Sequence, residues 1–156
     1  MGQRLDAYSV THLLGPLGIS VFEWQMITAN VVFASGDLRL RPRDMAKIGL
    51  LFLNRGRWNG TSVVSSDWVA AATARAVKPD GASSWADGCG YGWWRWDLGV
   101  GTRTHRMYMA AGWGGQWIIV SPDGAFVFVS TGRSYFDPTP MPADRLLVEY
   151  VLPAIQ

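Results

Sequence analysis

Residues 104–132, THRMYMAAGWGGQWIIVSPDGAFVFVSTG, constrain the fold more than any other part of the chain. Three apolar runs in this stretch are separated by turn residues, which is typical of consecutive short β-strands. In residues 116–120 and 126–129, bulky apolar groups fall on both faces of the strand, so we expect helices to cover the sheet from both sides. The sequence Ser-Pro-Asp-Gly at 121–124 predicts a tight hairpin turn in which Gly124 takes a left-handed conformation.

The size and composition of the chain restrict its class. Its 156 residues are enough for one domain, residues 1–156, with a sizeable core. Hydrophobic residues make up 49%, and the nine tryptophans require either a large core or a partner that covers them. The net charge is only +2 and the basic residues are scattered, so we expect no nucleic-acid partner. No apolar run approaches the roughly 20 residues of a membrane span, so we expect no membrane partner.

Cysteine and histidine usage gives no sign of a metal. Cys89 is the only cysteine, which excludes an internal disulfide, and we interpret it as a small buried residue. No cysteine and histidine cluster has zinc-like spacing. We therefore expect neither a metal nor another cofactor. The residues do not assign a cellular compartment.

Hydrophobic spacing predicts the remaining elements. We expect one helix at residues 5–14 with Leu5, Tyr8 and Leu13 inward, and another that has Pro42 as its first helical residue and continues through 43–53. Two more are expected: one capped by residues 65–67 that runs to about residue 76, with Trp68, Val69 and Ala72 for packing, and one at 143–152 with Leu146, Leu147, Tyr150 and Val151 buried. We expect loops with one short strand at residues 15–39 and a strand at residues 91–98. Between them, we expect residues 78–89 to form a long loop that serves as a binding lip.

The tryptophans near residue 94 allow two interpretations. Trp93, Trp94 and Trp96 with Tyr91 form either a stacking surface for sugars or bases, or part of the core. On an alternating strand Trp94 and Trp96 share one face while Tyr91 and Trp93 share the other, which suits a strand packed on both sides. We favour the core, and keep a carbohydrate-binding domain as the weaker alternative.

A complete set of catalytic groups is missing from the sequence. The two lysines, Lys47 and Lys78, are preceded three residues earlier by Asp44 and Arg75, so a Ser-x-x-Lys arrangement is absent. No Gly-x-Ser-x-Gly elbow is present either. The two histidines, His12 and His105, have no visible partner, and we interpret both as surface or edge residues. We assign no catalytic residue.

Several segments, taken in order, resemble the C-terminal part of the serine β-lactamase-like family. This family includes class C β-lactamases, penicillin-binding DD-peptidases, family VIII esterases and 6-aminohexanoate-dimer hydrolases. The similar segments are residues 8–19, 35–53, 54–69, the YGWW of 91–94, and AGWGGQWIIVSP at 111–122. One departure is Arg41, which stands where the family usually has Thr or Ser before proline, so that the following helix loses a side-chain cap.

The resemblance implies an α+β fold, a partial β-lactamase-like domain with an antiparallel sheet of three to four strands packed with helices. The family's Ser-x-x-Lys and Tyr-x-Asn motifs belong to its N-terminal half and have no counterpart here. Trp113-Gly114-Gly115 stands where relatives carry Lys-Thr-Gly, His-x-Gly or Trp-Gly-Gly. The resemblance therefore implies that Gly112, Trp113, Gly114, Gly115 and Gln116 line the substrate cleft and that a backbone N–H there serves the oxyanion hole.

Two functions of different classes follow. The first is a truncated serine hydrolase that is inactive alone, whose parent acts on a small-molecule ester, amide or β-lactam. Because Trp113 replaces a cation that would attract a substrate carboxylate, an ester or amide is favoured. The second is a binding or assembly module that forms a homo-oligomer, or complements a separate N-terminal half, through an open sheet edge at residues 125–132.

Overall fold

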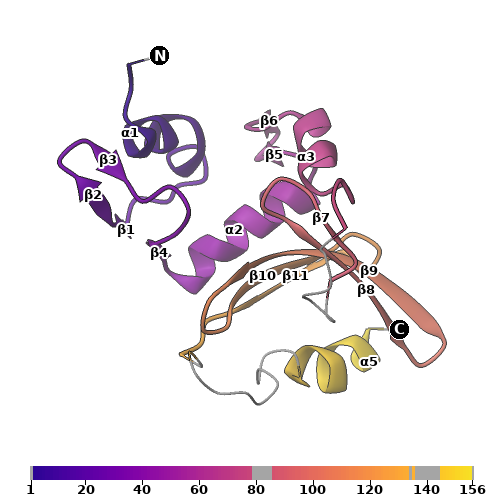
Figure 1. The fold of residues 1–156 in the computed structure, drawn as a ribbon. Helices are drawn as coiled ribbons and strands as arrows, with labels where there is room; N and C mark the ends of the chain where they lie inside the picture. The colour runs from indigo at the N-terminus through magenta and orange to yellow at the C-terminus, as the bar shows by residue number, and fades with distance from the viewer. Residues whose placement is uncertain (1, 79–85, 134, 136–144, 156) are drawn as a thin grey trace.

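The computed structural model describes residues 2–78, 86–133, 135 and 145–155. Its centre is a five-stranded antiparallel sheet in the order β11-β10-β9-β8-β7 (Figure 1). The strands are β7 (Gly88–Cys89), β8 (Trp94–Val100), β9 (Arg103–Gly112), β10 (Gln116–Ser121) and β11 (Phe126–Ser130). The α+β class and the strands of residues 104–132 are confirmed. The sheet has five strands instead of the three to four predicted, because Gly88 and Cys89, from the expected long loop, pair with β8.

Helices cover both faces of this sheet, as the apolar pattern predicted (Figure 1). Helix α2 (Pro42–Leu53) packs on β10 and β11. The opposite face meets the C-terminal helix, which comprises η2 (Leu147–Val151) and α5 (Leu152–Ala154). Met107, Met109 and Ile119 are buried on that face with Leu147 and Leu152. The two faces therefore carry separate apolar cores, and the sheet is interior.

Helix α2 begins at Pro42 and ends at Leu53, as its spacing predicted. Its N-cap, Arg41, makes no side-chain capping bond, and instead its Nε donates to the Asp44 carboxylate at 2.8 Å. Lys47 Nζ lies 2.8 Å from the same carboxylate and also donates to the Gly18 carbonyl at 3.0 Å. These two bonds, with that of Lys47 the stronger influence, lower the pKa of the buried Asp44. Lys47 thus links α2 to the preceding segment through its bond to Gly18.

The N-terminal segment differs from prediction. A short helix α1 (Leu5–Ser9) continues into η1 (Val10–Leu14), but Leu5 and Tyr8 are 43% and 48% exposed, whereas Leu14 is buried. The inward assignment of those two residues was wrong, because the buried cluster that includes Leu51 of α2 takes Leu14 from this segment. Residues 15–39 were expected to hold one strand and hold four: β1 (Phe22–Trp24), β2 (Met26–Thr28), β3 (Val31–Val32) and β4 (Leu38–Leu40). They form two small antiparallel pairs, β1 with β4 and β2 with β3.

The segment between α2 and the sheet contains a hairpin and one helix. The hairpin joins β5 (Arg57–Trp58) to β6 (Thr61–Ser62) through Asn59 and Gly60, which both have positive φ, as this turn type requires. Helix α3 (Ser66–Ala72) is capped by Ser65, whose Oγ accepts from the Trp68 N–H at 3.1 Å. It ends four residues before the predicted end, and Trp68 is 50% exposed and lies outside the core.

Other boundaries also shifted. Strand β8 begins at Trp94 and not at residue 91. The C-terminal helix buries Leu147 and partly buries Val151, but Leu146 and Tyr150 are 53% and 66% exposed, so two of its four predicted contacts were wrong. Most of the predicted binding lip, residues 79–85, lies outside the described residues, as do the first two residues of the helix expected at 143–152. Within the described chain, no helix has the length and apolar content to span a bilayer.

The turn between β10 and β11 shows a finer difference. The Gly124 N–H donates to Ser121 Oγ at 3.2 Å, so the predicted turn forms. The left-handed residue is Ala125, with φ of 52°, and not Gly124. The Ala125 N–H donates to the Pro122 carbonyl at 3.3 Å, which closes a turn over residues 122–125. The left-handed residue is the last residue of that turn.

Candidate functional site: the turn between strands β9 and β10

The turn at residues 112–116 is a three-residue connection between two long strands. Gly112 pairs with Gln116 in the ladder, and Trp113, Gly114 and Gly115 form the loop between them. The loop closes through the Gly115 N–H, which donates to the Gly112 carbonyl at 3.3 Å. Gly114 and Gly115 have φ of 83° and 93°, a conformation that residues with a Cβ rarely adopt. The two glycines at these positions are therefore a backbone requirement.

The end of β11 and the residues that follow it hold this turn in place. Gln116 Nε2 donates to the Gly132 carbonyl at 2.9 Å, and Ser130 Oγ donates to the Gly115 carbonyl at 3.2 Å. A Cβ on Gly132 would lie 2.6 Å from the Gly114 carbonyl oxygen, so the two backbones touch where Gly132 stands. The turn is thus fixed by side-chain and backbone contacts from a neighbouring strand end.

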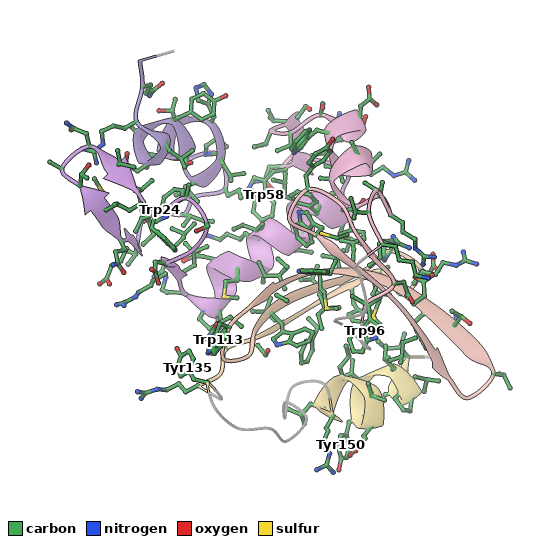
Figure 2. The ribbon with its side chains drawn as sticks, viewed as in Figure 1. Trp24, Trp58, Trp96, Trp113, Tyr135 and Tyr150 are labelled. Carbon is green, nitrogen blue, oxygen red and sulfur yellow. The ribbon has the colours of Figure 1, made fainter. Side chains whose placement is uncertain are left out.

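Two aromatic rings lie at this end of the sheet (Figure 2). Trp113 is 73% exposed, and Tyr135 is 44% exposed. The Tyr135 ring lies against Gly114, since a Cβ on that glycine would be 2.5 Å from its Cε1 atom. Tyr135 is a residue that sequence reasoning missed, because no periodic pattern connects it with the turn.

The turn also presents unused hydrogen-bond donors. Within the described chain, the backbone N–H groups of Trp113 and Gly114 have no hydrogen-bonding partner. Adjacent backbone N–H groups in a glycine-rich turn can bind an anion or a developing oxyanion. The arrangement therefore combines fixed N–H donors with an exposed apolar ring, which is suited to the wall of a cleft.

A nucleophile with its base is not assembled among the described residues. His12 is exposed and contacts Tyr8, with ring centroids 4.3 Å apart. His105 is only 6% exposed on β9, so its interpretation as a surface or edge residue was wrong: its side chain alternates onto the covered face with Met107. Cys89 is half-buried, and its Sγ donates to the Gly90 carbonyl. No group of three or more His, Cys, Asp and Glu in the described part of the chain could hold a metal ion.

The three neighbouring tryptophans do not form a single platform. Trp93 is buried on the α2 side, where its ring lies 4.3 Å from that of Phe52. Trp94 and Trp96 pack into the core on the opposite face of the sheet. Tyr91 lies outside the strand and stacks on Trp68 at 5.2 Å. The preferred core interpretation is confirmed for the three tryptophans, and the sugar-stacking alternative is wrong for them as a group.

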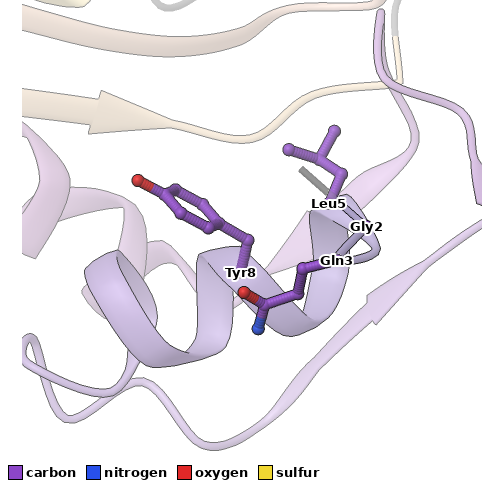
Figure 3. Close-up of a pocket in the computed structure, with 4 residues that line it drawn as sticks. All are labelled: Gly2, Gln3, Leu5 and Tyr8. Atoms are coloured by element: carbon purple, nitrogen blue, oxygen red, sulfur yellow. The ribbon is translucent and has the colours of Figure 1, made fainter.

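A hollow of about 460 Å³ beside α1 is a poor candidate for catalysis (Figure 3). It is lined by Gly2, Gln3, Leu5 and Tyr8. Figure 3 shows Leu5 and Tyr8 projecting from the same side of the helix. These residues supply apolar surface but no base, so the hollow is an exposed apolar face and not a reaction site.

Comparison with known proteins identifies the fold. No protein-family model and no curated protein sequence matches the chain. Among solved structures, it is similar to a Bacillus anthracis protein described as a 6-aminohexanoate-dimer hydrolase, with a TM-score of 0.72 and 20% identity over 99% of this chain and 38% of that one. It is also similar to a Bacteroides dorei DSM 17855 protein described as a β-lactamase, with a TM-score of 0.60 and 14% identity over 93% of this chain and 49% of that one.

The chain therefore spans less than half the length of each of these two structures. The match extends over nearly all of its own residues. The predicted resemblance is confirmed at the level of the fold: the described residues have the fold of part of a β-lactamase-like domain.

Proposed function

We propose that this chain supplies one wall of the acyl-transfer cleft of a β-lactamase-like serine hydrolase. The turn at residues 112–116 is that wall, and the reacting serine and its base come from polypeptide other than residues 1–156. The observation that carries the proposal is the fixed, exposed turn: Trp113 is 73% exposed beside two backbone N–H groups without partners in the described chain. The fold likeness supports the same location.

The chemistry of the turn favours an ester or a neutral amide as the substrate. A Lys or His at position 113 would place a cation beside the substrate, whereas Trp113 offers an apolar ring. The turn provides hydrogen-bond donors for the oxyanion but no charge of its own for a carboxylate. A β-lactam with its carboxylate is consequently the less favoured substrate.

The proposal predicts that residues 1–156 alone hydrolyse nothing. The test is fluorophosphonate labelling, together with turnover of a chromogenic ester and a chromogenic cephalosporin. We expect no label and no turnover above the rate with heat-denatured protein. Turnover that disappears when one particular serine of this chain is replaced would refute the assignment of the nucleophile to other polypeptide.

A second test uses the gene and the specificity. The DNA upstream of the Met1 codon is read for an in-frame Ser-x-x-Lys, and any longer product is assayed with paired substrates that do and do not carry a carboxylate. We expect Trp113→Lys to raise kcat/KM for the carboxylate substrate by about tenfold relative to its neutral counterpart, which is the scale of one charge-assisted bond. An unchanged ratio would show that residue 113 does not face the substrate.

A second candidate function is assembly through strand β11. This strand is at the end of the sheet order, and no described strand pairs with its outer edge. Its five residues are half-buried throughout, because helices cover its two faces while its edge remains open. An apolar strand with an open edge pairs readily with another chain. Light scattering over a range of concentrations tests this, and a strictly monomeric, heat-stable particle would rule it out.

A further inference from the structure

A second hollow lies at the other end of strand β10 from the turn at 112–116. Its volume is about 460 Å³, which is within the range of small-molecule sites. It is formed where the end of α2, helix α3 and the α2-facing side of β8 and β9 meet, and Pro122 borders it. Six residues of β10, about 20 Å of extended strand, separate Pro122 from the loop at Trp113.

The hollow presents two arginines and one acid. Arg55 and Arg95 line it, with Asp67 as an opposing charge among the lining residues, and Arg95 also forms an ion pair with Asp97, which lies outside the lining. Arg95 donates one hydrogen bond, from Nη2 to Asp97 at 3.4 Å, and among the described residues its guanidinium makes no other. Arg55 makes no ion pair within the described chain. Most of the N–H donors of the two guanidinium groups thus remain available for a ligand.

Hydroxyl and apolar groups complete the lining. Tyr108 is opposite Arg95 in the β8 and β9 pairing, and its ring is 5% exposed. Burial raises the pKa of Tyr108 to about 12, so its hydroxyl stays protonated and can donate. Phe52, Leu53 and Val69 add apolar surface. The hollow therefore combines a cationic fork and a hydroxyl donor with an apolar floor.

From this geometry we propose that the Arg55 and Arg95 hollow binds a small organic acid, with one carboxylate on a compact apolar body. The planar guanidinium fork matches a carboxylate, and the apolar floor accommodates the rest of the molecule. The two arginines are opposed by Asp67 and by Asp97, which pairs with Arg95, so the hollow does not balance a second negative charge and favours a monoanion over a dianion such as phosphate. This site goes beyond the proposed acyl-transfer cleft, because it shares no lining residue with residues 112–116.

The test is titration of the ¹⁵N-labelled chain with benzoate, followed by NMR. Benzyl alcohol is the neutral counterpart, and inorganic phosphate is the anion without an apolar body. We expect benzoate to shift the signals of Arg55, Arg95 and Tyr108, and to bind at least about tenfold more tightly than either control. Equal binding of benzyl alcohol, tighter binding of phosphate, or shifts centred on residues elsewhere would overturn the proposal.

Matched arginine variants show which guanidinium group binds benzoate. Arg95→Gln is expected to weaken benzoate binding about tenfold or more, and Arg55→Gln several-fold. Arg43→Gln removes the same charge from an exposed position near the start of α2 and should leave binding unchanged. If Arg95→Gln fails to fold, the exposed Arg55 carries the test. Equal weakening by Arg43→Gln would reduce the effect to overall charge and contradict a built site.

Discussion

The Gly114→Ala substitution tests whether the turn at 112–116 is held as rigidly as its contacts indicate. Gly114 has φ of 83°, and an added Cβ would lie 2.5 Å from Cε1 of the Tyr135 ring. Two separate costs therefore arise: the positive φ for a residue with a side chain, and displacement of the ring. Because both features belong to the proposed cleft wall, their sizes measure how well that wall is preorganised.

The magnitude follows from these two costs. A positive φ costs alanine about 1–2 kcal/mol relative to glycine. Overpacking a fitted contact costs about 1–3 kcal/mol, and the lower end applies because Tyr135 is 44% exposed and can turn toward solvent. We expect Gly114→Ala to lower the free energy of unfolding by about 2–3 kcal/mol.

The matched control is Gly101→Ala, in the turn between β8 and β9. Gly101 has φ of 61°, but no atom lies within 4 Å of an added Cβ. This variant carries only the backbone cost, about 1–2 kcal/mol. The difference between the two variants therefore isolates the contact with Tyr135.

The assay is urea denaturation followed by far-UV circular dichroism. The double variant Gly114→Ala with Tyr135→Ala should cost less than the sum of the two single variants, because the ring that the new Cβ strikes is gone. Equal costs for Gly114→Ala and Gly101→Ala, or full additivity in the double variant, would refute the packing of Tyr135 on the turn. The structural basis for a rigid wall would then be lost.

Three further substitutions test the framework that positions the turn. Asp44→Asn should destabilise the chain by about 1–3 kcal/mol at pH 7, since it removes a buried carboxylate bonded to two cations. The pKa of Asp44 is lower in the folded chain than in the unfolded chain, so the Asp44 carboxylate stabilises the fold above the unfolded pKa and loses this effect as the pH falls through the folded pKa. The difference in unfolding free energy between wild type and Asp44→Asn, measured by urea denaturation, should therefore shrink at low pH. Ser65→Ala removes the cap of α3 and should cost about 1 kcal/mol, whereas Ser66→Ala, the next residue, should change stability by less than about 0.5 kcal/mol; an equal effect of the two would contradict the cap. Leu51→Ala, at a residue with 0% exposure, should lower the unfolding free energy by about 2–5 kcal/mol, and Leu50→Ala, at 38% exposure, should have a much smaller effect in the same assay.

The central sheet and α2 could be predicted because their signals are local. Strands β9, β10 and β11 alternate or run apolar over five to ten residues and are bounded by glycine or proline turns. Proline at the first helical position and regular spacing fix α2 in the same way. In these elements the backbone preference and the packed face agree, so sequence alone identifies them.

The N-terminal strands and the buried faces of the shorter helices could not be predicted in this way. Strands of two or three residues, such as β2 and β3, are too short to show a period. Tyr8, Trp68 and Tyr150 lie at helical spacing, yet each is at least 48% exposed because the described chain packs other side chains of those helices. Spacing selects residues that share a face, but only a tertiary partner decides whether that face is covered.

In the candidate site, backbone geometry fixes the glycines, whereas nothing in the described chain fixes the side chain at position 113. Gly114, Gly115 and Gly132 are required by positive φ or by close backbone approach, and those requirements set the shape of the turn. Position 113 carries no such constraint, because its side chain is 73% exposed and its backbone is held by its neighbours. The geometry of the proposed wall is therefore independent of the residue at position 113. If the turn lines the proposed cleft, exchanging a cation for Trp113 changes the group offered to the substrate without changing the turn. Residue 113 is therefore the position at which the proposed specificity is tested.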